Sequence, residues 1–338
     1  MNSFRQILVT GGAGYVGARL IPRLLERGYR VKVLDLYLFG ADVLDPVKDD
    51  PKLEQVRGDL RDTALLRRLL PGCDAVIHLA CISNDPSFEL NPGLSRAINY
   101  DAFAPLVTIS RESGVRRFVY ASTSSVYGVS DAPEVTEDHP LIPLTDYNKY
   151  KGLCEPVLLE QARPDFVPVI IRPATLCGYS RRQRLDLTVN ILATHAVHTG
   201  KITIFGGTQK RPNLHIEDMV DLYLLLLDLP DAQIASRTFN AGYQNQTVAD
   251  LAQRVRSVVQ AEWPGRENLE LVTTPSNDLR SYHISSEKIR RELGFTPKRT
   301  IEDAVRDLLV AFRDGKLPNP MTDIRYYNIK SVQQAKLV

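Results

Sequence analysis

A glycine-rich turn near residue 10 constrains the fold of this chain more than any other feature. The apolar run Ile7 to Val9 leads directly into Thr10-Gly11-Gly12-Ala13-Gly14-Tyr15-Val16-Gly17, and a helical pattern follows. Glycines permit the tight turn and let the backbone approach a pyrophosphate, whose charge is met by amides at the helix N-terminus. The sequence therefore predicts a strand, a dinucleotide-binding turn and a helix; a merely tight loop is the alternative. The expected cofactor contacts here are Gly11, Gly14, Tyr15, Val16 and Gly17.

Apolar β-rich runs and helical patterns alternate through the first half of the chain. The expected strands are 6–10, 30–34, 75–79, 118–122 and 167–172, and the expected helices are 16–27, 63–70, 95–113 and 147–161. This alternation predicts an α/β fold with a doubly wound parallel sheet of the Rossmann type. Ligands of such sheets bind at the carboxyl ends of the strands.

The alternation of strand and helix patterns stops after Pro173, and the segments that follow are rich in Arg, Pro and Gly. This change indicates a smaller C-terminal substrate-binding domain. We expect the dinucleotide-binding domain to span residues 1–172 and to be rejoined by about 213–240. Residues 173–212 and 241–330 then form the substrate domain. Residues 315–338 are expected to wrap the surface as a tail.

The second expected strand ends at Leu34-Asp35. A carboxylate at this position accepts hydrogen bonds from the adenosine ribose hydroxyls and repels a 2′-phosphate, so the predicted cofactor is NAD rather than NADP. Gly58-Asp59-Leu60 lies in the loop where the adenine is expected to rest, with Asp59 and Leu60 as contacts. A helix-capping role is the alternative for Asp59.

The pair Tyr147 and Lys151 places a phenol and an ammonium one helical turn apart, on the same face. A phenol with its usual pKa of about 10 is a poor base at neutral pH. A neighbouring cation stabilises the phenolate and lowers that pKa. We therefore expect Lys151 to lower the pKa of Tyr147 and Tyr147 to accept a proton from an alcohol.

Charge and composition exclude several classes of function. Lys and Arg number 42 and Asp and Glu 40, and a net charge of +2 gives no reason to expect nucleic acid or an anionic membrane as a partner. The longest aliphatic run, Leu222 to Leu227, is far shorter than the roughly 20 residues that span a bilayer and indicates a buried helix. No signal-like segment opens the sequence, so we expect a cytoplasmic protein. The four cysteines have no metal-ligand spacing, and we expect neither a disulfide nor a metal site.

These motifs together resemble the extended short-chain dehydrogenase/reductase family, in its nucleotide-sugar epimerase and dehydratase branch, over roughly residues 5 to 312. Besides the glycine turn and the Tyr147/Lys151 pair, the landmarks are His78-Leu79-Ala80, Ser122 to Gly128, Glu155, Arg172-Pro173 and Arg211 to Asp218. The resemblance implies that Thr123 hydrogen-bonds the reacting sugar oxygen and that Tyr147 removes the proton from a sugar hydroxyl. It also implies that Lys151 holds the cofactor ribose. Further cofactor contacts implied by the family are Leu79, Ala80, Asn99 and Pro173.

For the nucleotide-sugar diphosphate, the resemblance nominates Arg211 and Arg280, because arginine forks suit phosphate oxygens. Many relatives carry Asn-Leu followed by an apolar residue and Pro where this chain has Thr188-Val189-Asn190-Ile191. The chain departs from the family's usual base and phosphate contacts there, and Asn190 is the candidate substitute. Ser124 is a weaker substrate candidate. Ser83 and Asn84 belong to a polar cluster, residues 81–87, that is expected to face the sugar; the alternative is a helix cap with Asp85 before Pro86.

Two departures from the family pattern favour simple epimerisation. The decarboxylating branch places a Glu immediately before Val-Tyr-Gly, where this chain has Ser125. The 4,6-dehydratases of this branch place an Asp-Glu pair after the catalytic threonine, where this chain has Ser124 and Ser125. We therefore expect an NAD-dependent nucleotide-sugar epimerase that reacts at C4 through a transient 4-keto sugar. The alternatives are an oxidoreductase or dehydratase of an unusual nucleotide sugar of heptose or uronate type, and a non-catalytic NAD-binding scaffold. By family analogy we expect a homodimer.

Overall fold

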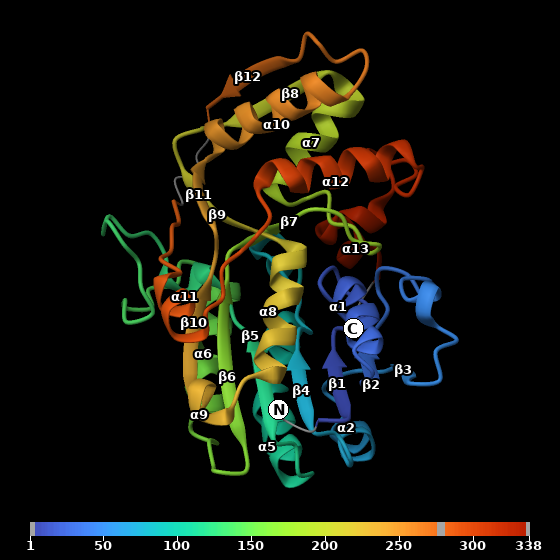
Figure 1. The fold of residues 1–338 in the computed structure, drawn as a ribbon, viewed down its shortest axis with the longest axis vertical. Helices are drawn as coiled ribbons and strands as arrows, with labels where there is room; N and C mark the ends of the chain where they lie inside the picture. Colours follow the sequence, from blue (N-terminus) through green and yellow to red (C-terminus); the bar gives the residue numbers. More distant parts are fainter. Residues whose placement is uncertain (1–3, 276–280, 336–338) are drawn as a thin grey trace.

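The computed structural model describes residues 4–275 and 281–335, and its largest element is a seven-stranded sheet (Figure 1). All neighbouring strands are parallel, in the order β10-β6-β5-β4-β1-β2-β3. The strands are β1 (Gln6–Thr10), β2 (Arg30–Asp35), β3 (Leu53–Arg57), β4 (Ala75–His78), β5 (Arg117–Ala121), β6 (Val167–Pro173) and β10 (Arg237–Ala241). The doubly wound α/β prediction is confirmed.

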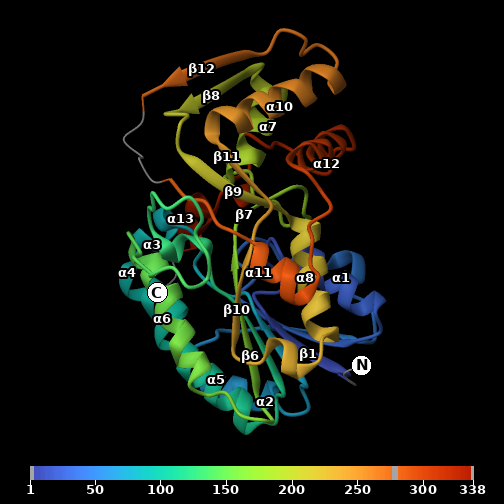
Figure 2. The ribbon, with the colours of Figure 1, turned by 60° about the vertical axis from the view of Figure 1, so that its left-hand side comes forward.

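Helices cover both faces of this sheet (Figure 2). One face carries α1 (Gly17–Glu26) and α8 (Ile216–Asp228); the other carries α2 (Thr63–Leu69), α5 (Phe103–Glu112) and α6 (Asp146–Leu159). Strand β1 shows why both layers form: Ile7 and Val9 pack with the first set of helices, whereas Leu8 packs with the second. All three side chains are fully buried, as expected for a parallel sheet covered on both sides.

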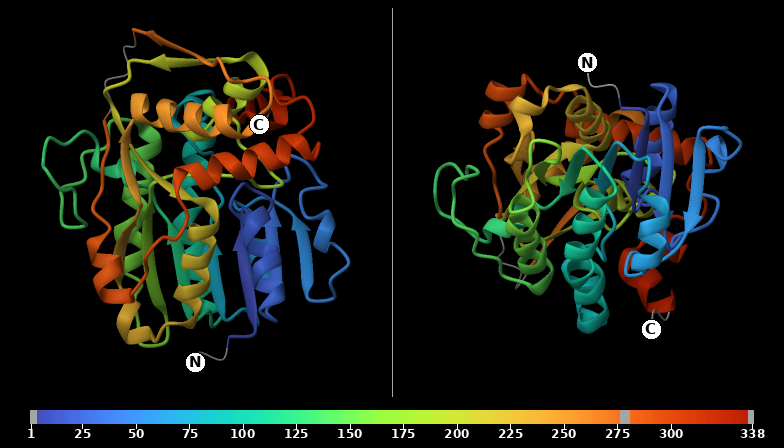
Figure 3. Two further views of the ribbon diagram at one scale, coloured as in Figure 1. Left: turned by 45° about the horizontal axis from the view of Figure 1, so that its top comes forward. Right: turned by 90° about the horizontal axis from the view of Figure 1, so that it is seen from below.

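A second hydrophobic core lies beyond the carboxyl ends of the large sheet's strands (Figures 1 and 3). It is built by α7 (Thr188–Thr199), α10 (Val248–Glu262), α12 (Ile301–Arg313) and the parallel pair β8 (Lys201–Phe205) and β12 (Glu270–Thr274). A three-stranded sheet of β7 (Thr175–Cys177), β9 (Lys210–His215) and β11 (Gln244–Thr247) connects the two cores. The remaining helices are α3 (Asp85–Glu89), α4 (Pro92–Arg96), α9 (Asp231–Ile234), α11 (Glu287–Leu293) and α13 (Asn328–Ala335).

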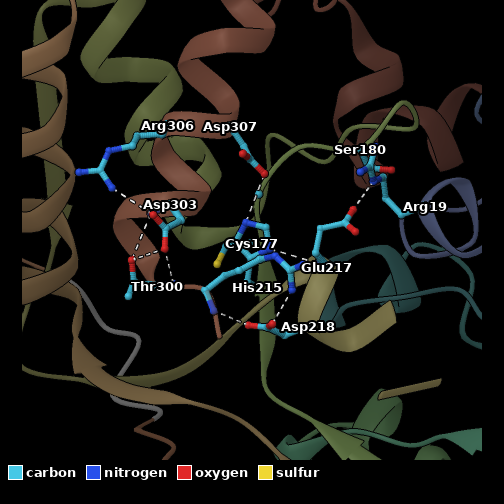
Figure 4. A network of polar contacts seen from close by, with 12 residues as sticks. Arg19, Cys177, Ser180, His215, Glu217, Asp218, Thr300, Asp303, Arg306 and Asp307 are labelled. Atoms are coloured by element: carbon cyan, nitrogen blue, oxygen red, sulfur yellow. Dashed lines mark hydrogen bonds and ion pairs between the residues drawn. The ribbon is translucent and has the colours of Figure 1, made fainter. Parts of the chain in front are cut away.

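Polar contacts around the start of α8 join the two parts (Figure 4). His215 caps α8 by accepting the amide of Glu217 at 3.1 Å, and its other ring nitrogen lies 3.3 Å from the Asp307 carboxylate on α12. Glu217 in turn accepts from Arg19 on α1. Asp218 accepts from the Arg299 side chain at 2.6 Å. The segment that follows β9 therefore fixes α12 relative to the large sheet.

Two expected elements differ from the structure. The expected helix 95–113 is interrupted by a π-helical turn at Ala97–Asp101, whose extra residue turns Asn99 inward. The expected surface tail is partly buried: Tyr326 belongs to the second core, and Asn328 is 3% exposed. Prolines and polar residues at 315–325 gave no sign that the following segment packs inside.

The longest aliphatic run, Leu222 to Leu227, lies within α8, and nearly all of its side chains are buried against the sheet. Among the described residues, no helix combines the length and apolar character needed to cross a membrane.

Candidate active site

A cavity of about 590 Å³ lies at the carboxyl ends of β1, β2, β4, β5 and β6. The segments that line it come from widely separated parts of the sequence, between Gly11 and Asn328. The predicted residues that line the cavity are Gly11, Gly14, Tyr15, Val16, Gly17, Asp35, Asp59, Leu60, Leu79, Ala80, Ser83, Asn84, Thr123, Ser124, Tyr147, Pro173 and Arg211. A single cavity thus brings together most of the predicted site.

The glycine turn is shaped to admit a diphosphate. Gly11 has φ of +73°, and a Cβ there would lie 2.6 Å from the Ala80 nitrogen, so a side chain does not fit. The N-cap residue of α1, Val16, makes no side-chain cap within the described residues, and the first turn holds no acidic residue. The amides of Ala18 and Arg19 already donate to the carbonyls of Gly14 and Val16. The amides just before them, from Tyr15 to Gly17, have no hydrogen-bond partner among the described residues and are left for phosphate oxygens, so the residues present fit NAD.

Asp35 is the last residue of β2 and lies next to the glycine turn. Its carboxylate accepts the amide of Ala13 at 2.9 Å and that of Tyr37 at 2.7 Å. Burial raises the pKa of Asp35, and these backbone hydrogen bonds oppose the shift. Because each carboxylate oxygen has a second lone pair, the group can still accept from ribose hydroxyls.

We expect Asp35→Asn to weaken NAD binding about tenfold. We also expect it to reduce the ratio by which the protein prefers NAD to NADP. The amide keeps one acceptor oxygen, so one backbone or ribose hydrogen bond is lost, at about 1 to 1.5 kcal/mol. The charge that repels a 2′-phosphate is lost as well. Calorimetric titration of both dinucleotides measures the ratio of their dissociation constants; an unchanged ratio would contradict this role.

Asp59 and Leu60, the predicted adenine contacts, line the cavity. Asp59 accepts the backbone amide of Arg61 at 2.8 Å and forms a salt bridge with its guanidinium at 2.7 Å. Hydrogen bonds from Arg61 lower the pKa of Asp59. The cap of the following helix α2 is Asp62 rather than Asp59, since Asp62 accepts the Leu65 amide.

Thr123, Ser124 and Tyr147 lie together at the reacting end, where β5 and α6 meet the cavity. The Thr123 hydroxyl lies 2.8 Å from the hydroxyl of Ser125, which donates to the side chain of Asn148. Asn148 sits next to Tyr147 on α6 and is 1% exposed. This chain of hydrogen bonds orients Thr123 relative to the helix that carries Tyr147.

Lys151 occupies the next turn of α6 after Tyr147. Its ammonium donates to the carbonyl of Ala121 and lies 4.5 Å from the centroid of the Tyr120 ring. Burial raises the pKa of Tyr147 well above its usual value, and the cation that opposes this is Arg184. The Ala121 carbonyl engages the ammonium here, and the expectation that Lys151 lowers this pKa stays a prediction. Lys151 also does not line the cavity.

A polar cluster closes the cavity beside Tyr147. Arg184 forms a bidentate ion pair with Asp186, with distances of 3.0 and 3.1 Å, and its third nitrogen lies 3.4 Å from the Ser83 hydroxyl. Ser83 also accepts from Asn328 at 2.6 Å. Asn84 caps α3 by accepting the Ser87 amide at 3.0 Å, so the cap expected at Asp85 falls one residue earlier.

Comparison with known proteins agrees with this arrangement. Residues 7–242 match the model of the NAD dependent epimerase/dehydratase family. The chain belongs to this family. Among curated relatives, UDP-glucose 4-epimerase of Lactobacillus helveticus is 28% identical over 323 residues, covering 89% of this chain and 94% of the relative. A dTDP-glucose 4,6-dehydratase of Streptomyces antibioticus is 27% identical over 322 residues, covering 92% and 94%.

Solved structures of the epimerase/dehydratase family superpose on most of the chain. The dTDP-glucose 4,6-dehydratase DesIV of Streptomyces venezuelae, solved with NAD bound, gives a TM-score of 0.81 at 26% identity and covers 94% of this chain and 100% of that one. MoeE5, solved with UDP-glucuronic acid and NAD, gives 0.78 at 27% identity, covering 92% and 99%. NAD is therefore the cofactor of this family member, as predicted.

Besides Lys151, three predicted residues either do not line the cavity or lie outside the described residues. Asn99 pairs with the backbone of Ile82 through both ends of its amide, at 2.8 and 2.9 Å, and shapes the loop after β4. Asn190 is fully buried; its side chain accepts the Gly178 amide at 3.0 Å and donates to the Arg184 carbonyl at 2.8 Å. It therefore holds the segment that lines the cavity without lining the cavity itself. Arg280 lies outside the described residues. Arg211 lines the cavity near Tyr282, whose ring centroid is 5.2 Å from its guanidinium carbon.

Several residues that line the cavity were not predicted from the sequence. They are Phe39, Ser125, Asn148, Arg182, Arg184, Asp186 and Asn328. Ser125 and Asn148 flank predicted residues and could have been found by proximity. The charged run Arg181-Arg182-Gln183-Arg184 was a signal, since several cations in a segment that follows a strand end suggest anionic ligands.

Proposed function

We propose that this family member is a nucleotide-sugar epimerase that inverts C4 through a transient 4-keto sugar. The observation that carries the proposal is the composition of the reacting end next to Thr123. Ser124 and Ser125 stand where the dehydratases it resembles have an Asp-Glu pair. A serine hydroxyl neither donates nor accepts protons readily near neutral pH, so the acid and base for removing water are missing from that position.

Two other carboxylates line this end of the cavity, and both have structural partners. Asp186 is held by the Arg184 fork, which keeps its pKa below the usual range despite burial. Asp85 accepts the hydroxyl of Thr145 at 2.7 Å at the start of α6. A carboxylate engaged in this way is a weaker proton carrier than one aimed at substrate. These contacts support epimerisation over dehydration.

In the proposed reaction, Tyr147 removes the proton from the sugar O4 while Thr123 donates a hydrogen bond to the same oxygen. The bound NAD supplies a hydride acceptor that later returns the hydride. Between the two events the keto sugar must present its other face, so the diphosphate needs a firm anchor and the ring needs loose contacts. Arg211 offers the anchor, and the small hydroxyls of Ser83, Thr123 and Ser124 leave room for rotation.

The proposal is tested by mixing the purified protein, without added cofactor, with UDP-, GDP-, CDP-, ADP- and dTDP-sugars. Mass spectrometry and proton NMR then follow the products. We expect a product of unchanged mass with inverted coupling at ring position 4. Loss of water or of two hydrogens would contradict the proposal in favour of a dehydratase or an oxidoreductase. No turnover of any sugar, with NAD bound, would favour a scaffold.

Uronic acid derivatives belong in the panel because of Arg184. Its side chain is 12% exposed and lies at the reacting end beside Tyr147, where a sugar carboxylate would find a partly desolvated cation. Preference for UDP-glucuronic acid over UDP-glucose would identify the substrate class, whereas the reverse preference would assign Arg184 to holding Asp186.

We further propose a homodimer that works in the cytoplasm. The helices α5 and α6 lie side by side on one face of the sheet (Figure 2), and Leu153 on α6 is 41% exposed. The four free cysteines suit a reducing compartment. Light scattering after size-exclusion chromatography measures the mass in solution; a monomer at micromolar concentration would contradict the dimer.

A further inference from the structure

The segment from Gly178 to Arg184 leaves the substrate side of the cavity and lies against the glycine turn. The Ser180 hydroxyl donates to the Tyr15 carbonyl at 2.7 Å. In return, the Tyr15 hydroxyl donates to the Gly178 carbonyl at 2.7 Å. These reciprocal hydrogen bonds attach a segment that comes after β7 to the turn that receives the cofactor diphosphate.

Arg182 is the residue that this attachment brings over the cofactor half of the cavity. Its guanidinium carbon lies 3.5 Å from the centroid of the Phe39 ring, in the loop that follows β2. Both side chains line the cavity together with Asp35 and the glycine turn. After Arg184 and Asp186, the groups that act electrostatically on Arg182 are Asp35 and Tyr15, both at the cofactor turn. By contrast, Arg184 faces Ser83 and the Tyr147 end. The two arginines therefore serve different halves of the site.

The guanidinium of Arg182 is buried without a full set of partners. Arg182 is 3% exposed, and within the described residues it has no salt bridge and its Nε has no hydrogen-bond partner. Burial lowers its pKa, and the neighbouring Arg184 adds to the effect. Asp186 and Asp35 attract this cation only without direct pairing, and a buried cation without a directly paired anion is destabilising unless a ligand supplies one.

Asn328 holds this cation in place from α13. Its side-chain oxygen accepts from Arg182, its side-chain nitrogen donates to Ser83 at 2.6 Å, and its backbone amide donates to Asp186 at 3.1 Å. A buried asparagine with these contacts fixes the orientation of the guanidinium before any ligand arrives. Asn328 is therefore a positioning residue.

We propose that Arg182 binds the diphosphate of NAD from the side opposite the glycine turn, so that the cofactor is clamped between the two parts of the molecule. The turn contributes backbone amides and the N-terminus of α1 on one side. Arg182 contributes a preoriented cation on the other, and the diphosphate supplies its missing counter-ion. This role depends on the bound dinucleotide alone, and the identity of the sugar does not enter.

The test compares Arg182→Met with Arg181→Met in calorimetric titrations of ADP and of adenosine, using protein stripped of resident nucleotide. Arg181 is the matched control, since it is the adjacent arginine, is exposed and does not line this cavity. We expect Arg182→Met to bind ADP about 30-fold more weakly, the loss typical of a charge-assisted hydrogen bond, and to bind adenosine within twofold of the wild type. Arg181→Met should bind both as the wild type does.

Each other outcome would overturn the assignment. Unchanged ADP binding in Arg182→Met, or an equal loss for adenosine, would show that Arg182 only shapes the wall. Weaker binding of UDP and dTDP, with ADP unaffected, would move Arg182 to the sugar nucleotide. Thermal unfolding without ligand serves as a folding control: Arg182→Met should unfold no earlier than the wild type, because a buried unpaired charge is removed. If Arg182→Met does not fold, Arg182→Lys takes its place, with ADP binding about tenfold weaker expected and wild-type ADP binding excluding the clamp.

Discussion

Replacing Tyr147 by phenylalanine is expected to lower turnover about 1,000-fold or more while leaving the protein folded with NAD bound. General acid-base catalysis by a positioned side chain contributes about 10²- to 10⁴-fold, and the substitution removes the only group on α6 that can perform it at the cavity wall among the described residues. The ring packs edge-on against Phe88, with centroids 6.5 Å apart, and phenylalanine preserves that contact. Steady-state rates with the substrate found in the sugar panel, and the NAD content of the purified variant, measure the two effects.

Tyr150→Phe is the matched control for this variant. Tyr150 lies one turn further along α6 and stacks on the same Phe88, with centroids 5.7 Å apart, but it does not line the cavity. It should retain wild-type turnover. Because burial raises the pKa of Tyr147, turnover of the wild type should also rise with pH as the phenolate forms, and Tyr147→Phe should lose this dependence. Equal rates for the two variants would exclude Tyr147 as the base.

The second large effect is expected from Gly17→Ala, which should weaken NAD binding about 100-fold and lower the melting temperature. A Cβ at Gly17 would collide with the backbone of Gly12, reaching 2.5 Å from its Cα. These are main-chain atoms of the glycine turn and cannot move aside as a flexible side chain can. Overpacking of this kind costs the folded state about 3 kcal/mol, which lowers the melting temperature. The turn must shift to relieve the overlap, so its amides no longer meet the diphosphate, and a loss of about 3 kcal/mol in those contacts corresponds to roughly 100-fold in affinity.

Gly93→Ala is the control that tests whether the loss of NAD affinity and stability in Gly17→Ala is specific to the glycine turn. Gly93 lies within α4, and the nearest atom to an added Cβ there is the Asn91 side-chain oxygen at 3.8 Å, so alanine fits. Helix propensity makes this substitution neutral or slightly stabilising. Titration of NAD and thermal unfolding of both variants give the comparison. Wild-type affinity in Gly17→Ala would mean that the turn rearranges more freely than its packing suggests.

The parts of the fold that were predictable from sequence are those with strong hydrophobic patterns. Strands β1, β4 and β6 are buried on both faces and appear as continuous apolar runs. Strand β3 escaped prediction because it is an edge strand whose side chains, such as Glu54 and Gln55, face solvent. Its place is set by pairing with β2 rather than by its own pattern.

The site residues also divide into those that local sequence patterns predict and those that they do not. Residues within local motifs, such as the glycine turn, Asp35 and Tyr147, were found because the motif fixes their position in the fold. Arg182 and Asn328 were missed because their roles depend on contacts between segments 146 residues apart in sequence. Lys151 shows the same limit: spacing on a helix shows which side chains share a face, but it does not show that the Ala121 carbonyl on β5 binds the ammonium.

The cavity draws its walls from residues as far apart as Asp35 and Asn328, and this affects the order of events during synthesis on the ribosome. At about 5 to 20 residues per second, roughly 15 to 60 s pass between the appearance of these two residues. During that interval the glycine turn and the ribose-binding strand end can form while the covering segments are still missing. The nascent chain would therefore exchange dinucleotide rapidly at first and retain it only once the late segments had packed, so cofactor capture would be one of the last steps of maturation.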